Sequence, residues 1–129
     1  MNRKQRRALA KAQKSNQIRV IIIDPQLQTI EVKYVAPDLD IYYKLLKCQR
    51  ICDVNIITDL AKQDCFMYAD DAGRLKQNHY FTIGTITIPG IAMIVGGFKS
   101  GEDLSASIPL ADVKNIVNWH GIQPSNFGI

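Results

Sequence analysis

The sequence predicts an α+β fold: a single, mostly antiparallel sheet with two helices packed on it, preceded by a flexible or helical basic N-terminal arm. Three observations support this prediction. Several short segments alternate in polarity or are rich in β-branched residues, as strands are. Only two segments show helical spacing, and they do not alternate with the strands, which argues against a doubly wound parallel sheet. A length of 129 residues suits one domain.

The predicted domain begins with a hairpin. The β-branched run IRVIIID, residues 18–24, is typical of a strand buried on both faces. The next segment, QTIEVKYV, alternates and places Ile30, Val32 and Tyr34 on one face. Because Asp24-Pro25 favours a turn, we expect the two strands to be antiparallel, with a loop near 25–27. Leucines and tyrosines at helical spacing then predict a helix over about 38–48.

Further strands are expected in the second half of the chain. They are CDVNIITDL, DCFMYAD, HYFTI, TITI, the buried run IAMIV and, as one further short strand, LSASI at 104–108. The segment PLADVKNIVNWHG predicts a closing helix with Gly121 as its C-cap. In that helix Trp119 and His120 lie in the last turn, and the inward positions are Leu110, Val113, Ile116 and Val117. The chain is thus divided into an arm (1–17), one domain (18–122) and a tail (123–129).

The basic arm is the first candidate site. The net charge of +4 is uneven, because residues 1–17 carry six cations and no acid while the remainder is slightly acidic. Such cations can neutralise nucleic-acid phosphates or other anions. The candidate residues are Arg3, Lys4, Arg6, Arg7, Lys11 and Lys14. The arm lacks the aromatic residues that stack on bases, so a merely solubilising terminus is the alternative.

The adjacent carboxylates Asp70 and Asp71 are the second candidate. Paired carboxylates can hold a divalent cation for phosphoryl chemistry. However, neighbours in a strand point to opposite faces, and residues 72–78 contain no acid. An aspartate at a turn accepts backbone hydrogen bonds, and Gly73 can adopt a left-handed conformation. We therefore predict that residues 70–73 form the turn of a hairpin, and we assign no catalytic residue and no metal ligand.

Two further segments carry candidate binding residues. Glycines after a buried strand can present N–H groups to a phosphate, so we consider a ligand loop of Gly96, Gly97, Lys99 and Ser100. The spacing is not that of a P-loop, and a flexible connection is the alternative. On the first helix and just after it, aromatic and basic side chains mix in the way of a protein interface. These are Tyr42, Tyr43, Lys47 and Arg50.

The small number of cysteines and the shortness of the apolar runs indicate the cellular compartment in which the protein is expected. Three cysteines, Cys48, Cys52 and Cys65, are too few for a disulfide scaffold, and they lack the spacing of a structural zinc site. The sequence shows no secretory signal and no apolar run of about 20 residues. We therefore expect reduced thiols, a cytoplasmic location, no contact with a membrane and no cofactor.

Four segments together carry a resemblance. IIIDP, VNII, MYADDAGRLKQN and GIAMIVGGF, within residues 18–100, resemble an uncharacterised family of small proteins of unknown function. That family is common in phages, plasmids and other mobile elements. The resemblance implies a cytoplasmic accessory protein of a mobile element, which acts in a host bacterial cell by binding a host macromolecule or a signalling molecule. The family offers no catalytic residues to carry over.

The expected function is that of a non-enzymatic, phage-type accessory protein that binds a host macromolecule or a nucleotide signalling molecule. Two alternatives stay open. One is a nucleic-acid-binding protein that acts through the arm. The other is a small metal-dependent hydrolase that uses Asp70 and Asp71. The sequence is also compatible with a homo-oligomer.

Overall fold

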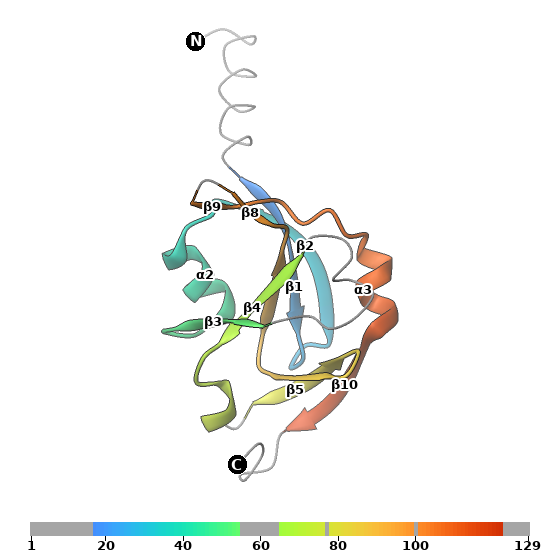
Figure 1. Ribbon diagram of the computed structural model, residues 1–129. Coiled ribbons are helices and arrows are strands. Elements are labelled where there is room, and N and C mark those ends of the chain that lie inside the picture. Colours follow the sequence, from blue (N-terminus) through green and yellow to red (C-terminus); the bar gives the residue numbers. More distant parts are fainter. Residues whose placement is uncertain (1–16, 55–64, 77, 100, 123–129) are drawn as a thin grey trace, which may run out of the picture.

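The computed structural model describes residues 17–54, 65–76, 78–99 and 101–122 (Figure 1). Its elements form a five-stranded sheet of order β2-β1-β7-β4-β3, a three-stranded sheet of order β10-β5-β6 and the ribbon β8-β9. Every strand pairing in these sheets is antiparallel. In chain order the elements are β1 (Ile18–Asp24), β2 (Thr29–Val35), α2 (Leu39–Leu46), β3 (Ile51–Val54), β4 (Phe66–Asp70), the 3-10 turn η2 (Gly73–Leu75), β5 (His79–Ile83), β6 (Ile86–Pro89), β7 (Ala92–Val95), β8 (Phe98–Lys99), β9 (Glu102–Asp103), α3 (Leu110–Ile116) and β10 (Val117–Ile122).

The five-stranded sheet is covered on both faces. Side chains alternate along a strand, so Ile21 and Ile23 of β1 enter one core with the three-stranded sheet and α3. Val20 and Ile22 enter a second core under α2. Figure 1 shows α2 on one side of β1 and β4, with β5, β10 and α3 on the other. The prediction that 18–24 is buried on both faces and pairs with 29–35 is confirmed.

The prediction of a single sheet is wrong, because the strands form separate five-stranded and three-stranded sheets. The antiparallel α+β character and the two helices are confirmed. After β4 the chain leaves the first sheet, forms the β5–β6 hairpin and then returns as β7 between β1 and β4. The apolar face with Ile21, Ile23 and Met67 needs a wide cover. Phe81 and Ile83 of the three-stranded sheet supply it together with α3, because one helix of seven residues is too short for five strands.

The predicted hairpin turn at 70–73 is also wrong. β4 pairs with β3 and β7, whereas β5 pairs with β10 and β6, so the segment between β4 and β5 joins two sheets. Among the glycines that the structure describes, Gly84, Gly90 and Gly101 have positive φ, and Gly73 does not. Instead it is buried, and a Cβ added to it would stand 2.8 Å from the carbonyl oxygen of Pro89. The absence of a side chain therefore lets the turn approach β6.

The closing helix is shorter than predicted. α3 ends at Ile116, and residues 117–122 form β10, in which Val117 pairs with Ile83 and Trp119 with Phe81. Trp119 and His120 therefore lie on a strand, and Gly121 caps no helix. The alternation of Val117, Asn118 and Trp119 fits a half-buried strand, and packing of Trp119 against Phe81 outweighs the helical spacing.

Residues 104–108 form no strand, contrary to the prediction. They are held against the start of β1 by Arg19. The Ala106 N–H donates to the Arg19 carbonyl oxygen at 2.7 Å, and one guanidinium nitrogen of Arg19 donates to the carbonyl oxygens of Ala106 and Ile108 at 2.8 and 2.9 Å. The Arg19 side chain thus supplies some of the hydrogen bonds that a paired β-strand would otherwise make.

Other predictions agree or fall outside the described residues. The helix predicted over 38–48 is α2, with Asp38 as its N-cap, and the strand predicted from Cys52 is β3 as far as Val54. Residues 55–64, the arm to residue 16 and the tail from residue 123 lie outside the described residues. No helix in the described part of the chain is long and apolar enough to cross a bilayer.

We predict that Gly73→Ala destabilises the protein by about 1–3 kcal/mol, because the new methyl group meets backbone that cannot move aside easily. The matched control is Gly121→Ala, whose Cβ has nothing within 4 Å and which should stay within about 0.5 kcal/mol of wild type. Urea unfolding measures both. Equal stability of the two variants would contradict the packing role of Gly73.

Candidate functional site

Two carboxylates lie at one end of the five-stranded sheet because of its register. Ala92 of β7 pairs with Ile23 of β1 on one side and with Ala69 of β4 on the other. The residue that follows in each flanking strand is an aspartate, so Asp24 and Asp70 lie on either side of the start of β7. Side-chain alternation turns both toward the face that carries α2. They are 8 % and 9 % exposed.

Each aspartate is held by the turn that follows its strand. Oδ1 of Asp24 accepts the N–H groups of Gln26 at 3.0 Å and Leu27 at 3.2 Å. Oδ1 of Asp70 accepts the N–H of Ala72 at 2.9 Å, and its Oδ2 lies 2.7 Å from the ammonium nitrogen of Lys76. The prediction that Asp70 accepts a backbone hydrogen bond in a turn is thus confirmed, although the turn belongs to no hairpin.

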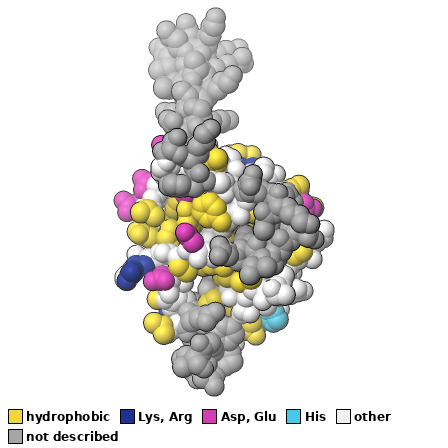
Figure 2. All heavy atoms as spheres, viewed as in Figure 1, with side chains coloured by type: hydrophobic (Ala, Val, Ile, Leu, Met, Phe, Trp, Pro, Cys, Tyr) yellow, Lys and Arg dark blue, Asp and Glu magenta, His cyan; other side chains and the backbone are white. Residues whose placement is uncertain are grey.

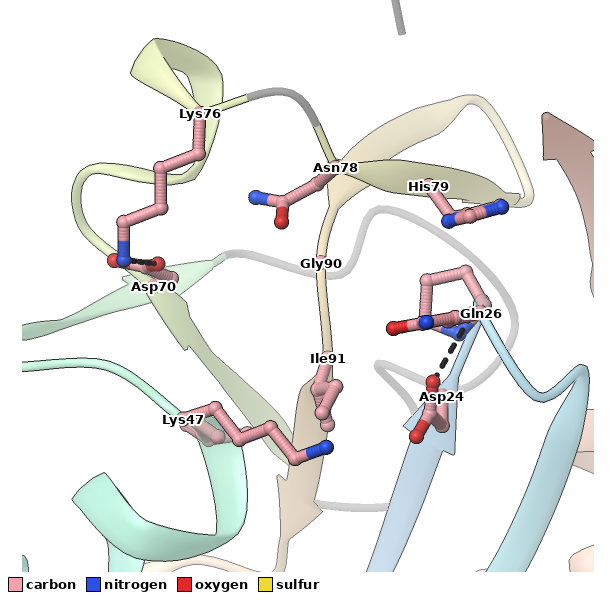
Figure 3. Close-up of a pocket in the computed structure, with 11 residues that line it drawn as sticks. Asp24, Gln26, Lys47, Asp70, Lys76, Asn78, His79, Gly90 and Ile91 are labelled. Atoms are coloured by element: carbon pink, nitrogen blue, oxygen red, sulfur yellow. Dashed lines mark hydrogen bonds and ion pairs between the residues drawn. The ribbon is translucent and has the colours of Figure 1, made fainter. Parts of the chain in front are cut away.

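A small pocket of about 90 Å³ opens between these aspartates (Figure 3). Lys47 reaches toward it from the end of α2, while Asn78 and His79 border it from the start of β5. Lys47 has φ 52°, a left-handed conformation that favours glycine and costs other residues about 1 kcal/mol or more. A lysine at this helix end thus brings a long cation to the pocket at a cost in backbone energy.

A wider groove of about 690 Å³ adjoins the pocket and shares Lys47, Asp70 and Lys76 with it. Its four cations outnumber its two carboxylates; they are Lys44, Lys47, Arg50 and Lys76, against Asp70 and Asp71. Tyr43 and Leu75 add apolar surface, and Leu75 is 83 % exposed. In Figure 2 a basic side chain projects at the edge of the molecule beside the connection from α2 to β3. We call this hollow the cationic groove.

The structure separates the four predicted interface residues. Tyr43, Lys47 and Arg50 line the cationic groove. Tyr42 lies on the inner face of α2, 2 % exposed, in the core under the helix. The sequence therefore located three residues of the groove, and the helical period explains why the fourth faces the opposite way.

Tyr42 belongs instead to a partly buried cluster that fixes the β8–β9 ribbon. Its hydroxyl donates to Oδ2 of Asp103 at 2.8 Å, and the Tyr68 hydroxyl donates to Oδ1 of the same carboxylate at 2.7 Å. The tyrosine rings are 5.7 Å apart. Burial first, and the hydrogen bond to Asp103 second, raise the pKa of both tyrosines well above the ordinary value. The cluster ties β9 to α2 and β4.

The predicted ligand loop offers fewer free donors than expected. The Gly96 N–H donates to the Leu104 carbonyl oxygen at 2.8 Å, and the Leu104 N–H donates to the Gly97 carbonyl oxygen at 2.7 Å. A Cβ on Gly96 would meet the carbonyl oxygen of Ser105. Lys99 pairs with Glu102 through the backbone, and Ser100 lies outside the described residues. Gly96 thus has a packing role, and anion binding at this loop stays a prediction.

Cysteines and metal ligands do not converge in the described ranges. Cys48, Cys52 and Cys65 form no disulfide, and no group of three or more His, Cys, Asp or Glu side chains is close enough to hold a metal ion there. Burial, followed by the charge of Asp70, raises the pKa of the Cys48 thiol. The thiolate is therefore disfavoured, which makes Cys48 a weak nucleophile.

Sequence reasoning missed several residues around the pocket. The sequence patterns indicate only a turn at Asp24 and place Lys76, Asn78 and His79 in a predicted hairpin. A polar residue at the end of a buried strand is the available signal for Asp24. Nothing in the sequence links residue 24 to residues 76–79, because the link depends on β7 entering between β1 and β4.

We predict that stability falls at alkaline pH because of Tyr42 and Tyr68. Their pKa is near 10 in the unfolded chain and higher in the folded state, so folding retains protons that the unfolded chain loses. The contribution of the two tyrosines to the free energy of unfolding is complete below about pH 10. It declines as the pH rises toward the folded pKa. Urea unfolding between about pH 9 and 11 should show a smaller decline for Tyr42→Phe/Tyr68→Phe than for wild type.

The control for this prediction is Tyr34→Phe, at a side chain that is 63 % exposed. Its unfolding free energy should follow the wild-type pH dependence. An equal alkaline decline in the double variant and in wild type would show that Tyr42 and Tyr68 do not cause it.

Comparison with protein-family models, with curated proteins and with solved structures finds no match for the chain. Its function therefore has to be inferred from the site itself.

Proposed function

We propose that this protein is a non-enzymatic binding protein that holds a phosphate-bearing small molecule of the nucleotide class in the cationic groove. The observation that carries the proposal is the unbalanced charge of the groove. Asp70 already pairs with Lys76, and Asp71 with Arg50. Lys44 and Lys47 make no ion pair within the described part of the chain. Two cations thus remain for the negative charge of a ligand.

Arg50 can also bind the phosphate, together with the two lysines, with little loss of protein stability. Its Nε lies 3.9 Å from Oδ2 of Asp71, and both side chains are well exposed, so this ion pair contributes little to stability. A guanidinium group binds phosphate oxygens through parallel hydrogen bonds. Arg50 therefore gains more from a phosphate than it loses by releasing Asp71.

The apolar part of the groove favours a ligand with a ring over a bare anion. Tyr43 lines it from α2 and the exposed Leu75 from the turn before β5. A nucleobase can stack on a tyrosine ring, and such contacts contribute about 1–3 kcal/mol per base. A phosphate group with an attached aromatic ring therefore matches both parts of the groove.

The wider setting belongs to the same proposal. The ligand would be a nucleotide signalling molecule, and the protein would be a mobile-element accessory protein in a host cell. A second candidate is a nucleic-acid-binding protein that uses the arm, favoured by its six cations without an acid in residues 1–17. The arm and the groove are separate elements, so one experiment distinguishes them.

We predict that ATP, as a probe, binds to the full-length protein and that Lys44→Gln/Lys47→Gln weakens this binding at least about tenfold, because two charged contacts are lost. Isothermal titration calorimetry measures the affinity. The matched control is Lys33→Gln/Lys114→Gln, at exposed lysines of β2 and α3 away from the groove, which should leave the affinity within about twofold of wild type.

Deletion of residues 1–16 completes the test. ATP binding that survives the deletion supports the groove, whereas binding that disappears with the arm supports the second candidate. A wild-type protein that binds neither ATP nor tripolyphosphate at moderate salt would overturn the proposed function.

A further inference from the structure

We infer that the small pocket beside the cationic groove binds sugar hydroxyls, so that the ligand is a ribose-bearing nucleotide rather than any phosphate compound. The inference rests on the proposed function, since the groove would hold the phosphates of the same molecule. It adds an assignment for a second hollow and names Asp24 as the residue that recognises the hydroxyl groups.

The first observation is an oxygen of Asp24 that lacks a hydrogen-bond donor. Oδ1 accepts two backbone N–H groups, but Oδ2 has no hydrogen bond or ion pair with any described residue. Asp24 is only 8 % exposed, and its carboxylate borders the pocket in Figure 3. Buried carboxylate oxygens are nearly always hydrogen-bonded, to protein groups or to water, so this atom is available to a donor from a bound molecule.

The second observation is the charge of the pocket. The pocket is lined by equal numbers of carboxylates and cations, Asp24 and Asp70 against Lys47 and Lys76, whereas the groove, which shares both lysines, is lined by more cations than carboxylates. No ion pair joins Lys47 to Asp24, although both line the pocket. A hydroxyl group can donate to Oδ2 of Asp24 and accept from the ammonium group of Lys47 at the same time. A neutral hydroxyl therefore suits the pocket, while an anion is better placed in the groove.

The third observation is size. The pocket of about 90 Å³ has room for a few water molecules. That space fits the hydroxyl-bearing edge of a ribose and is too small for a base. Asn78 donates its amide to the Gly73 carbonyl oxygen at 3.1 Å, which leaves its own oxygen to accept a further hydroxyl.

The pocket and the groove also adjoin each other. They share Lys47, Asp70 and Lys76, so the ends of one small molecule can occupy both. In a nucleotide the ribose hydroxyls and the phosphates are only a few bonds apart. One molecule therefore satisfies Asp24 in the pocket and the free lysines in the groove.

The experiment compares three probes by calorimetry: ATP, 2′,3′-dideoxy-ATP and tripolyphosphate. The wild-type protein should bind ATP at least about tenfold more tightly than the dideoxy compound, because a site built for hydroxyl groups rejects an analogue that lacks them. In Asp24→Asn the side-chain oxygen can still accept from Gln26 and Leu27, but the amide in place of Oδ2 cannot accept. This variant should bind the two nucleotides within about twofold of each other without losing affinity for tripolyphosphate.

The matched control is Asp53→Asn, an exposed aspartate of β3, which should keep the wild-type preference for ATP. If Asp24→Asn does not fold, the comparison of ATP with the dideoxy compound on the wild-type protein still decides. Equal affinities there, with tripolyphosphate bound, would overturn the ribose pocket and leave the proposed function intact. Absence of binding by all three probes would overturn the proposed function itself.

Discussion

The rest of the structure depends on the burial of β1 and β7 on both faces. Ile21, Ile23 and Ile94 face one core, while Val20, Ile22 and Met93 face the other, and all but Ile22 are fully buried. Burial of an aliphatic side chain contributes about 1.5–3 kcal/mol, so both faces must be covered for the fold to be stable. The cover on one face is α2, and on the other it is the three-stranded sheet with α3 (Figure 1). This chain supplies the second cover by leaving the first sheet after β4 and returning as β7.

This route also produces the candidate site. Because β7 enters between β1 and β4, the last residues of those two strands lie beside its start, and both are aspartates. The end of α2 lies over the same edge and brings Lys47, while the turn before β5 brings Lys76. The stretch with Asp70 and Asp71 thus has a structural role and also lines a hollow. Its carboxylates are neutralised by Lys76 and Arg50, and the charge left over comes from α2.

Local patterns predicted much of the fold. The apolar run of β1, the alternation of β2 and the helical spacing of α2 each belong to one element and are legible in the sequence. The two most consequential errors concern contacts between segments that are far apart in the sequence. The spacing of apolar residues alone does not show that Trp119 packs on Phe81 from a strand, or that β4 and β5 belong to different sheets. The groove was predicted in part, through Tyr43, Lys47 and Arg50. The pocket was not, because Asp24 and His79 meet only through the order of the strands.

The most direct test of the central claim is an NMR titration of the ¹⁵N-labelled full-length protein with ATP, followed through backbone amide shifts. The account predicts that the largest shifts cluster at residues 43–50 and 70–79, with a further shift at Asp24, and that the β8–β9 ribbon changes little. Largest shifts at residues 96–103 or within residues 1–16, with the groove unaffected, would contradict it.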